Sequence, residues 1–132
     1  MQTRLQKWLD KMEDKKSSEP ILYLSGPMSG YSDFNATAFF RATDMLRGKG
    51  YTVINPHELP EPDVAGLSEL EAWAEYLARD VMLFAKITEP VVLVLLPGWE
   101  LSRGALLERA VAKQRGFQVT TYGEILKGDF HV

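Results

Sequence analysis

The fold is decided by one stretch of the chain, VVLVLLPGWELSRGALLE at residues 91–108. Its first six residues form an unbroken apolar run, which is typical of a strand buried on both faces of a parallel sheet. A turn with a glycine follows, and Ser102 then begins a predicted helix that Gly116 ends. A strand, a glycine-containing turn and a helix N-terminus in this order predict a ligand site at the carboxyl edge of the sheet.

Strands and helices alternate through the rest of the chain. Apolar runs predict strands at 21–24, 51–54, 91–96 and 117–121, and helical patterns lie at 35–47, 68–86, 102–115 and 122–127. Asn35 is expected to cap the first of these helices, and Ser68 with Glu71 forms a capping box at the start of the second. Right-handed crossovers favour the strand order 2-1-3-4. We therefore predict an α/β fold, a single-domain three-layer sandwich with a parallel, flavodoxin- or Rossmann-like sheet.

The N-terminal segment predicts an additional amphipathic helix. Residues 1–16 carry apolar side chains at helical spacing on one face, namely Leu5, Trp8, Leu9 and Met12. This face is expected to pack on the domain or on a second subunit. We divide the chain into the helix with its linker, residues 1–19, and a domain at residues 20–132.

The composition is that of a soluble globular domain, with 132 residues of which 45% are hydrophobic and 25% charged. A net charge of −3 argues against a general nucleic-acid-binding surface. The absence of cysteine excludes disulfides, thiolate catalysis and cysteine-bound zinc, and His57 and His131 lie too far apart in the sequence to favour a metal site. No apolar run approaches the roughly 20 residues of a membrane span, and the charged N-terminus lacks a signal-peptide core. We expect a cytoplasmic protein without a metal ion, an organic cofactor, or a nucleic-acid or membrane partner.

In the predicted strand order, the loops after the first and third strands meet at the carboxyl edge of the sheet. The first loop, Ser25–Gly30, holds two glycines and two serines. Glycine lets the backbone approach a ligand, and serine hydroxyls with free backbone N–H groups suit phosphate or sugar oxygens. The loop matches neither the P-loop nor the dinucleotide-binding motif. A tight turn that uses its glycines and proline only for geometry explains the same residues.

Two carboxylates are candidates for chemistry at this edge. Glu108 lies less than two turns after the start of its predicted helix, beside small residues that leave room for a ligand. An exposed Glu108 paired with a nearby cation is the alternative. Asp80 is expected at the border of the buried face of helix 68–86. A solvated carboxylate there, or one paired with Arg79 or Arg103, is commoner than a catalytic one.

Aromatic and histidine side chains allow two interpretations as well. Trp99 and Tyr31 lie in the two loops, where they could stack on a base or sugar or could cover the core. His57 follows the second strand and is expected to be a loop residue, with substrate contact as the alternative. Core positions are expected for Phe34, Phe39 and Phe40.

Four stretches of the chain together resemble a known family. They are Tyr23–Gly30, Gly50–Pro56, Arg79-Asp80 and Leu96–Glu108. They are similar to the nucleoside 2-deoxyribosyltransferase-like superfamily, and especially to small bacterial and phage proteins that share a domain of unknown function, DUF4406. The resemblance covers about residues 20–125.

This resemblance implies an enzyme that cleaves or transfers the N-glycosidic bond of a 2′-deoxynucleoside or its 5′-monophosphate. Glu108 would attack the anomeric carbon, and Asp80 would assist or orient the leaving base. A homo-oligomer is also implied, because related enzymes often complete their site from a neighbouring subunit. The implied substrate-binding residues are Tyr23, Ser25, Gly26, Pro27, Met28, Ser29, Gly30, Pro97, Gly98, Trp99, Ser102 and Gly104.

Other functions fit the same sequence. A non-catalytic nucleotide-binding or sensing module would keep both loops and tolerate the loss of Glu108. An interaction protein would bind its partner through the N-terminal helix. Transfer and hydrolysis use the same carboxylates, so the sequence does not separate them. A substrate phosphate would need a pocket, for which the candidates are Ser25, Ser29, Ser102, Arg41 and Arg103.

Overall fold

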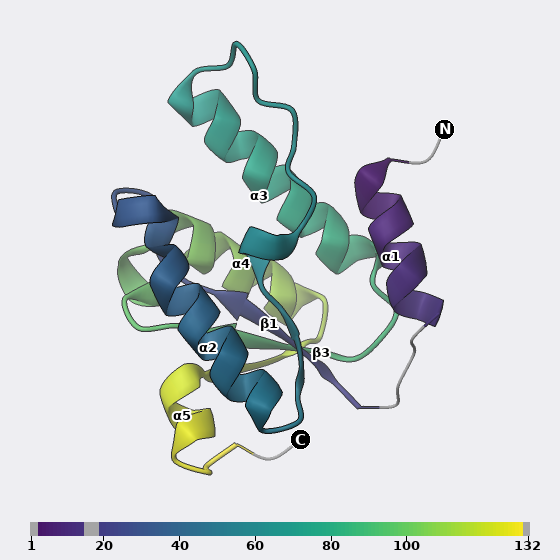
Figure 1. The fold of residues 1–132 in the computed structure, drawn as a ribbon, viewed down its shortest axis with the longest axis vertical. Coiled ribbons are helices and arrows are strands. Elements are labelled where there is room, and N and C mark those ends of the chain that lie inside the picture. The colour runs from purple at the N-terminus through teal and green to yellow at the C-terminus, as the bar shows by residue number, and fades with distance from the viewer. Residues whose placement is uncertain (1–2, 15–18, 131–132) are drawn as a thin grey trace.

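The computed structural model describes residues 3–14 and 19–130 (Figure 1). A parallel sheet at the centre of these residues consists of β1 (Ile21–Ser25), β2 (Thr52–Ile54), β3 (Val91–Leu95) and β4 (Gln118–Thr121). The strand order is β2-β1-β3-β4, and each neighbouring pair is parallel. The predicted α/β class, parallel sheet and strand order are therefore confirmed.

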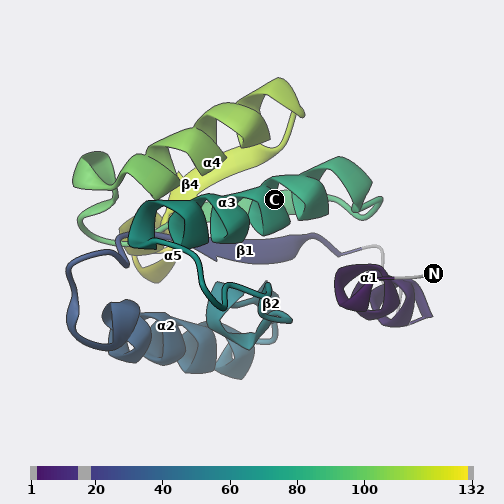
Figure 2. The same ribbon diagram turned by 90° about the horizontal axis from the view of Figure 1, so that it is seen from above.

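Helices cover both faces of this sheet. They are α1 (Arg4–Asp14), α2 (Ala36–Gly48), α3 (Glu69–Lys86), α4 (Arg103–Gln114) and α5 (Tyr122–Leu126), with short 3-10 helices η1 (Ser32–Asn35), η2 (Pro56–Glu58) and η3 (Trp99–Leu101) in the loops. Figure 2 shows α2 on one side of the sheet and α3 with α4 on the other, which gives the predicted three layers. Within residues 3–14 and 19–130, no helix has both the length and the apolar character needed to cross a bilayer.

The two faces of the strands build two separate cores, because successive side chains of a strand point to opposite faces. Leu22 and Leu24 of β1 belong to the cluster that also contains Phe39 of α2. Tyr23 belongs to the opposite cluster, with Phe84 of α3. Ser25 follows Tyr23 by two residues, so the pleat directs both side chains to the face that α3 and α4 cover.

Two helix starts follow the predicted capping. The hydroxyl of Ser68 accepts the N–H of Glu71, and the Glu71 carboxylate accepts the N–H of Ser68, both at 3.1 Å. This capping box begins α3 as predicted. The hydroxyl of Ser102 accepts the N–H of Ala105 at 3.2 Å and begins α4. Capping of this kind fixes where the N-termini of α3 and α4 lie relative to the loops.

The loop before α2 differs from the prediction. Asn35 occupies the position before the helix, but its side chain does not cap it and instead donates to the carbonyl oxygen of Pro27 at 2.9 Å. Its backbone is left-handed, as are those of Asp33 and Phe34, with φ angles of 63°, 49° and 52°. The turn carries Phe34 outward, where 66% of it is exposed.

Only one of the three phenylalanines expected in the core is buried there. Phe39 is fully buried, whereas Phe40 is 40% exposed. Phe40 follows Phe39 on α2 and therefore points about 100° away from it around the helix axis. The expectation that Phe34 and Phe40 are core residues is thus wrong.

The N-terminal helix α1 packs its apolar face on the domain, one of the two partners expected for it. Leu9 is buried, and Leu5 and Trp8 pack against the cluster that contains Phe84 of α3. The side chain of Met12, also expected on this face, lies outside the described residues. The division of the chain between residues 19 and 20 stays a prediction.

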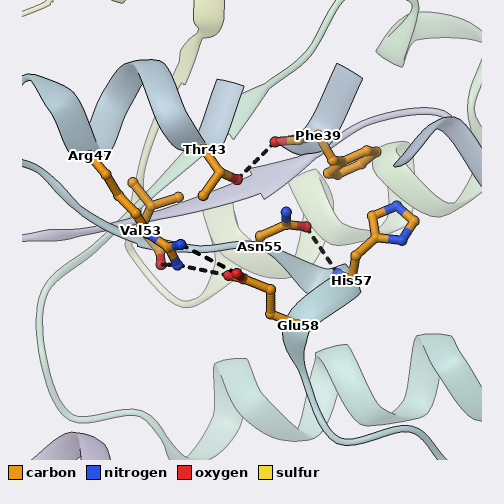
Figure 3. A network of polar contacts seen from close by, with 7 residues as sticks. All are labelled: Phe39, Thr43, Arg47, Val53, Asn55, His57 and Glu58. Carbon is orange, nitrogen blue, oxygen red and sulfur yellow. Dashed lines mark hydrogen bonds and ion pairs between the residues drawn. The ribbon is translucent and has the colours of Figure 1, made fainter. Parts of the chain in front are cut away.

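Polar contacts with α2 fix the carboxyl end of β2 (Figure 3). Arg47 donates to a carbonyl oxygen of β2 at 3.1 Å and pairs with Glu58 at 2.7 Å. The side chain of Asn55 accepts the N–H of His57 at 3.0 Å, which begins η2. These contacts hold the His57 ring beside Phe39, with the ring centroids 4.9 Å apart.

Candidate functional site

A cavity of about 300 Å³ opens at the carboxyl edge of the sheet, between the loops after β1 and β3 and the helices α3 and α4. The predicted site residues that line it are Gly26, Pro27, Met28, Ser29, Asp80, Gly98, Ser102, Gly104 and Glu108. Tyr23 and Ser25 reach it through their contacts with Glu108. Gly30, Pro97 and Trp99 belong to the same loops but do not line the cavity.

Two glycines allow the loops to approach each other. A Cβ atom on Gly26 would lie 2.9 Å from Cβ of Leu96, which is too close for any larger residue. Gly98 has φ 88°, and a Cβ atom there would lie 3.2 Å from Cγ of Pro27 and 3.3 Å from the hydroxyl of Tyr31. Glycine at these positions is therefore required by the packing of one loop on the other.

Glu108 lines the cavity, and only 6% of it is exposed. The hydroxyl of Tyr23 donates to Oε2 of Glu108 at 2.9 Å, and the hydroxyl of Ser25 donates to Oε1 at 2.7 Å. Both donors come from the same face of β1. The alternative of an exposed Glu108 paired with a cation is thus excluded.

Asp80 is also buried, rather than at the border of the buried face as expected, with 8% of it exposed. Its partner is Arg79, whose Nε and Nη2 each lie 3.0 Å from Oδ1 of Asp80. Arg79 itself lies over the ring of Tyr76 at 5.2 Å. Arg103, the other candidate partner, lies over the ring of Trp73 at 4.9 Å.

Burial raises the pKa of both carboxyls. For Glu108 the rise is large, because desolvation is reinforced by the charge of Asp80. Desolvation raises the pKa of Asp80 as well, but the guanidinium of Arg79 opposes it. Two such carboxyls titrate as a coupled pair and keep a proton between them at pH values where exposed carboxyls have lost theirs. Burial and both carboxylates raise the pKa of Tyr23, so its phenol stays a neutral donor.

The mouth of the cavity carries three of the five side chains that are candidates for a phosphate pocket. Ser29, Ser102 and Arg103 line the cavity beside the N-terminus of α4, whose first backbone N–H groups favour anions. Ser25 instead donates to Glu108, and Arg41 lies in a different groove, beside α5. The structure therefore brings three of these five side chains together.

Several cavity residues were missed by the sequence reasoning. Leu70, Trp73, Tyr76 and Leu77 of α3 line the cavity on the same helix face as Asp80. The spacing of Trp73, Tyr76 and Leu77 is also that of a buried helix face, so it does not distinguish cavity from core. The signal that could have found them is Asp80 itself, because a carboxylate within an apolar helix face indicates that this face borders a polar cavity.

Trp99 has a structural position in this protein. It packs against the core cluster on the α3 side of the sheet, and the guanidinium of Arg109 lies over its ring at 5.5 Å. Of the two loop aromatics, Tyr31 is the one that lines the cavity.

The fold and the cavity define a small Rossmann-like α/β protein with two buried carboxyls at the carboxyl edge of its sheet. The chain belongs to the family described as a domain of unknown function (DUF4406), whose family model matches residues 20–121. A search among curated proteins finds no match to the chain.

Proposed function

We propose that this protein cleaves or transfers the N-glycosidic bond of a 2′-deoxynucleoside or its 5′-monophosphate. The observation that carries the proposal is the buried Glu108 carboxylate, held by two hydroxyls beside a second carboxyl in a cavity. A volume of about 300 Å³ is at the lower end of the range for small-molecule sites. Two carboxyls, one ionised and one protonated, are the groups that glycosidic cleavage needs.

In the first step, a Glu108 oxygen forms a bond to the anomeric carbon as the bond from that carbon to the base nitrogen breaks. The electron pair of the broken bond leaves with the base, which takes a proton from Asp80. The reaction therefore needs the shared proton on Asp80 and the charge on Glu108. In the free protein, burial and the charge of Asp80 raise the pKa of Glu108, and Arg79 opposes the rise at Asp80, so the shared proton favours Glu108. The hydroxyls of Ser25 and Tyr23 act in the other direction, because they lower the pKa of Glu108. Positive charge on the sugar in the transition state stabilises the Glu108 carboxylate and moves the proton to Asp80.

In the second step, a nucleophile forms a bond to the anomeric carbon as the bond from that carbon to the Glu108 oxygen breaks, and the electron pair returns to the carboxylate. Asp80, now ionised, takes a proton from water in a hydrolase or from the incoming base in a transferase, and Glu108 is regenerated. The lack of a 2′-hydroxyl on deoxyribose eases the development of positive charge at the anomeric carbon. The positive end of α4 and Arg103 support an anionic substrate group such as a 5′-phosphate.

The homo-oligomer is part of the same proposal. Leu70, Leu101 and Tyr31 line the cavity and are 65%, 93% and 50% exposed. Several large apolar side chains around one opening are unusual for a surface that faces only water. A second copy that covers this rim would remove water from the cavity. We place the protein in the cytoplasm, where nucleotides are available.

The test is chromatography of the protein incubated with 2′-deoxynucleosides and their 5′-monophosphates, with and without a second free base. We expect release or exchange of the base by the wild type and its loss in Glu108→Gln. Glu100→Gln is the matched control, because Glu100 lies in η3 beside the cavity but does not line it. Thermal stabilisation by these compounds without turnover of any of them would overturn the enzymatic proposal in favour of a nucleotide-binding module.

A further inference from the structure

A second cavity, of about 200 Å³, also borders Asp80. It shares Met28, Tyr76 and Asp80 with the first cavity, and its other walls include Phe34 and His57. A volume of this size is below that of sites that hold whole small molecules. Because the two cavities have walls in common, the smaller one is suited to hold one part of a ligand whose remainder lies in the larger one.

The two carboxyls are placed differently relative to these cavities. Asp80 borders both of them, whereas Glu108 borders only the first. In the proposed reaction Glu108 must contact the sugar and Asp80 must reach the base. The sugar therefore belongs in the first cavity, and the base belongs in the cavity that Asp80 borders and Glu108 does not.

The walls of the second cavity suit a flat heterocycle. Met28, Phe34, Pro56 and Tyr76 supply apolar and aromatic surface. Phe34 is exposed and is held by the left-handed turn at η1. A ring bound against it would bury apolar surface that now faces water.

His57 supplies a polar group with an unmet hydrogen bond. Its Nε2 atom is buried and has no hydrogen-bond partner in the described part of the chain, residues 3–14 and 19–130. Buried polar atoms without partners are rare in folded proteins, and a bound ligand is one way to satisfy them. The ring is held against Phe39, and its backbone N–H is bound by Asn55 (Figure 3). Burial lowers the pKa of His57, although a hydrogen bond between its ring and the backbone of Phe34 opposes the shift, so the ring is neutral at pH 7 and suits an uncharged base.

We propose that the second cavity binds the nucleobase of the substrate and that His57 is a specificity-determining residue that hydrogen-bonds the edge of this base. This inference rests on the proposed function. It adds a location for the base, the aromatic surface that the base covers, and the residue that distinguishes one base from another.

The first experiment observes the His57 ring directly. The chain has two histidines, so the protein labelled with ¹⁵N-histidine gives signals from His57 and His131 alone, and His57→Gln assigns them. Adenine, hypoxanthine, cytosine, thymine and 2-deoxyribose are added separately. We expect a saturable shift of the His57 signal with at least one base, with no shift by deoxyribose and no change at His131. No shift with any base or any deoxynucleoside would overturn the proposal.

The second experiment compares substrates. His57→Gln should change the ratio of kcat/KM between two bases by about tenfold or more, while the pH profile set by Asp80 and Glu108 stays unchanged. Glu58→Gln is the matched control, because Glu58 lies in the same 3-10 helix but pairs with Arg47. If His57→Gln does not fold, Phe34→Ala tests the same cavity from an exposed position.

The outcomes separate the two proposals. If the His57 and Phe34 variants turn over substrate with an unchanged ratio of kcat/KM between two bases, the base cavity is refuted and the glycosidic function stands. A base-dependent shift of the His57 signal without turnover would refute the enzymatic function and leave a base-binding cavity.

Discussion

The hydroxyl of Ser25 lies 2.7 Å from Oε1 of Glu108, although the two residues are 83 positions apart in the sequence. Ser25 is the last residue of β1, and Glu108 lies in the second turn of α4. The contact joins the end of one central strand to the helix that follows the other. It therefore fixes the position of the candidate nucleophile relative to the sheet and not only relative to its own helix.

Replacement of Ser25 by alanine should weaken this position and raise the pKa of Glu108 further, because the serine hydroxyl stabilises the ionised carboxylate. Loss of one partner of a buried hydrogen bond costs about 1–3 kcal/mol of stability. We expect a decrease of this size in urea unfolding, together with a lower kcat whose acidic limb moves to higher pH. Thr43→Val, which removes a buried hydroxyl far from the cavity, is the control. An unchanged pH profile in Ser25→Ala would contradict the role assigned to Ser25.

The central strands and the helix starts could be predicted because local sequence determines them. Val91–Leu95 is apolar throughout, and Ser68 with Glu71 forms its capping box within a single turn. The burial of Glu108 could not be predicted in the same way. The sequence of its helix fits a buried Glu108 beside a ligand and an exposed Glu108 paired with a cation equally well. Only the contacts with Tyr23 and Ser25, which come from β1, distinguish the two.

The left-handed turn before α2 is the clearest failure of local reasoning. Asp33 and Asn35 accept a positive φ more readily than most residues, but Phe34 between them does not. The turn exists because tertiary contacts hold it, among them the bond from Asn35 to Pro27. No pattern in residues 31–36 contains that information.

The strain of this turn can be measured. Asp33→Gly should raise the free energy of unfolding by about 0.5–1 kcal/mol, because glycine adopts φ 49° without a steric cost and loses only part of this gain to chain entropy. Asp44→Gly is the matched control. Asp44 is an exposed residue of α2, where glycine should instead cost about 0.3 kcal/mol, the difference between the helix propensities of aspartate and glycine. Thermal unfolding of both variants gives the comparison, and equal destabilisation by the two would show that the turn is unstrained.

The exposed rim of the cavity leads to a prediction about assembly. Leu101 is 93% exposed beside the cavity mouth, and a second copy of the chain would cover it. Leu101→Asn should shift the protein towards the monomer in light scattering coupled to size exclusion, with the fold retained in circular dichroism. Leu126→Asn is the control, because Leu126 is exposed at the end of α5 and does not line the cavity. A wild type that is monomeric at all accessible concentrations would contradict the proposed homo-oligomer.

The raised pKa of Glu108 predicts how stability depends on pH. The unfolded chain loses the proton of a glutamic acid near pH 4.3, whereas burial and the charge of Asp80 keep the proton on the folded protein to higher pH. Between these two pKa values the folded state binds more protons than the unfolded state, so the free energy of unfolding falls as pH rises. The stabilising effect of the neutral carboxyl is complete below about pH 4.3 and is lost as pH rises through the folded pKa.

Glu108→Gln cannot titrate, so the stability of the wild type relative to this variant should decrease with rising pH in this window. Urea unfolding of both proteins from pH 4 to pH 8 measures the difference, and a difference that is constant with pH would mean that Glu108 ionises in the folded protein as it does in the unfolded chain.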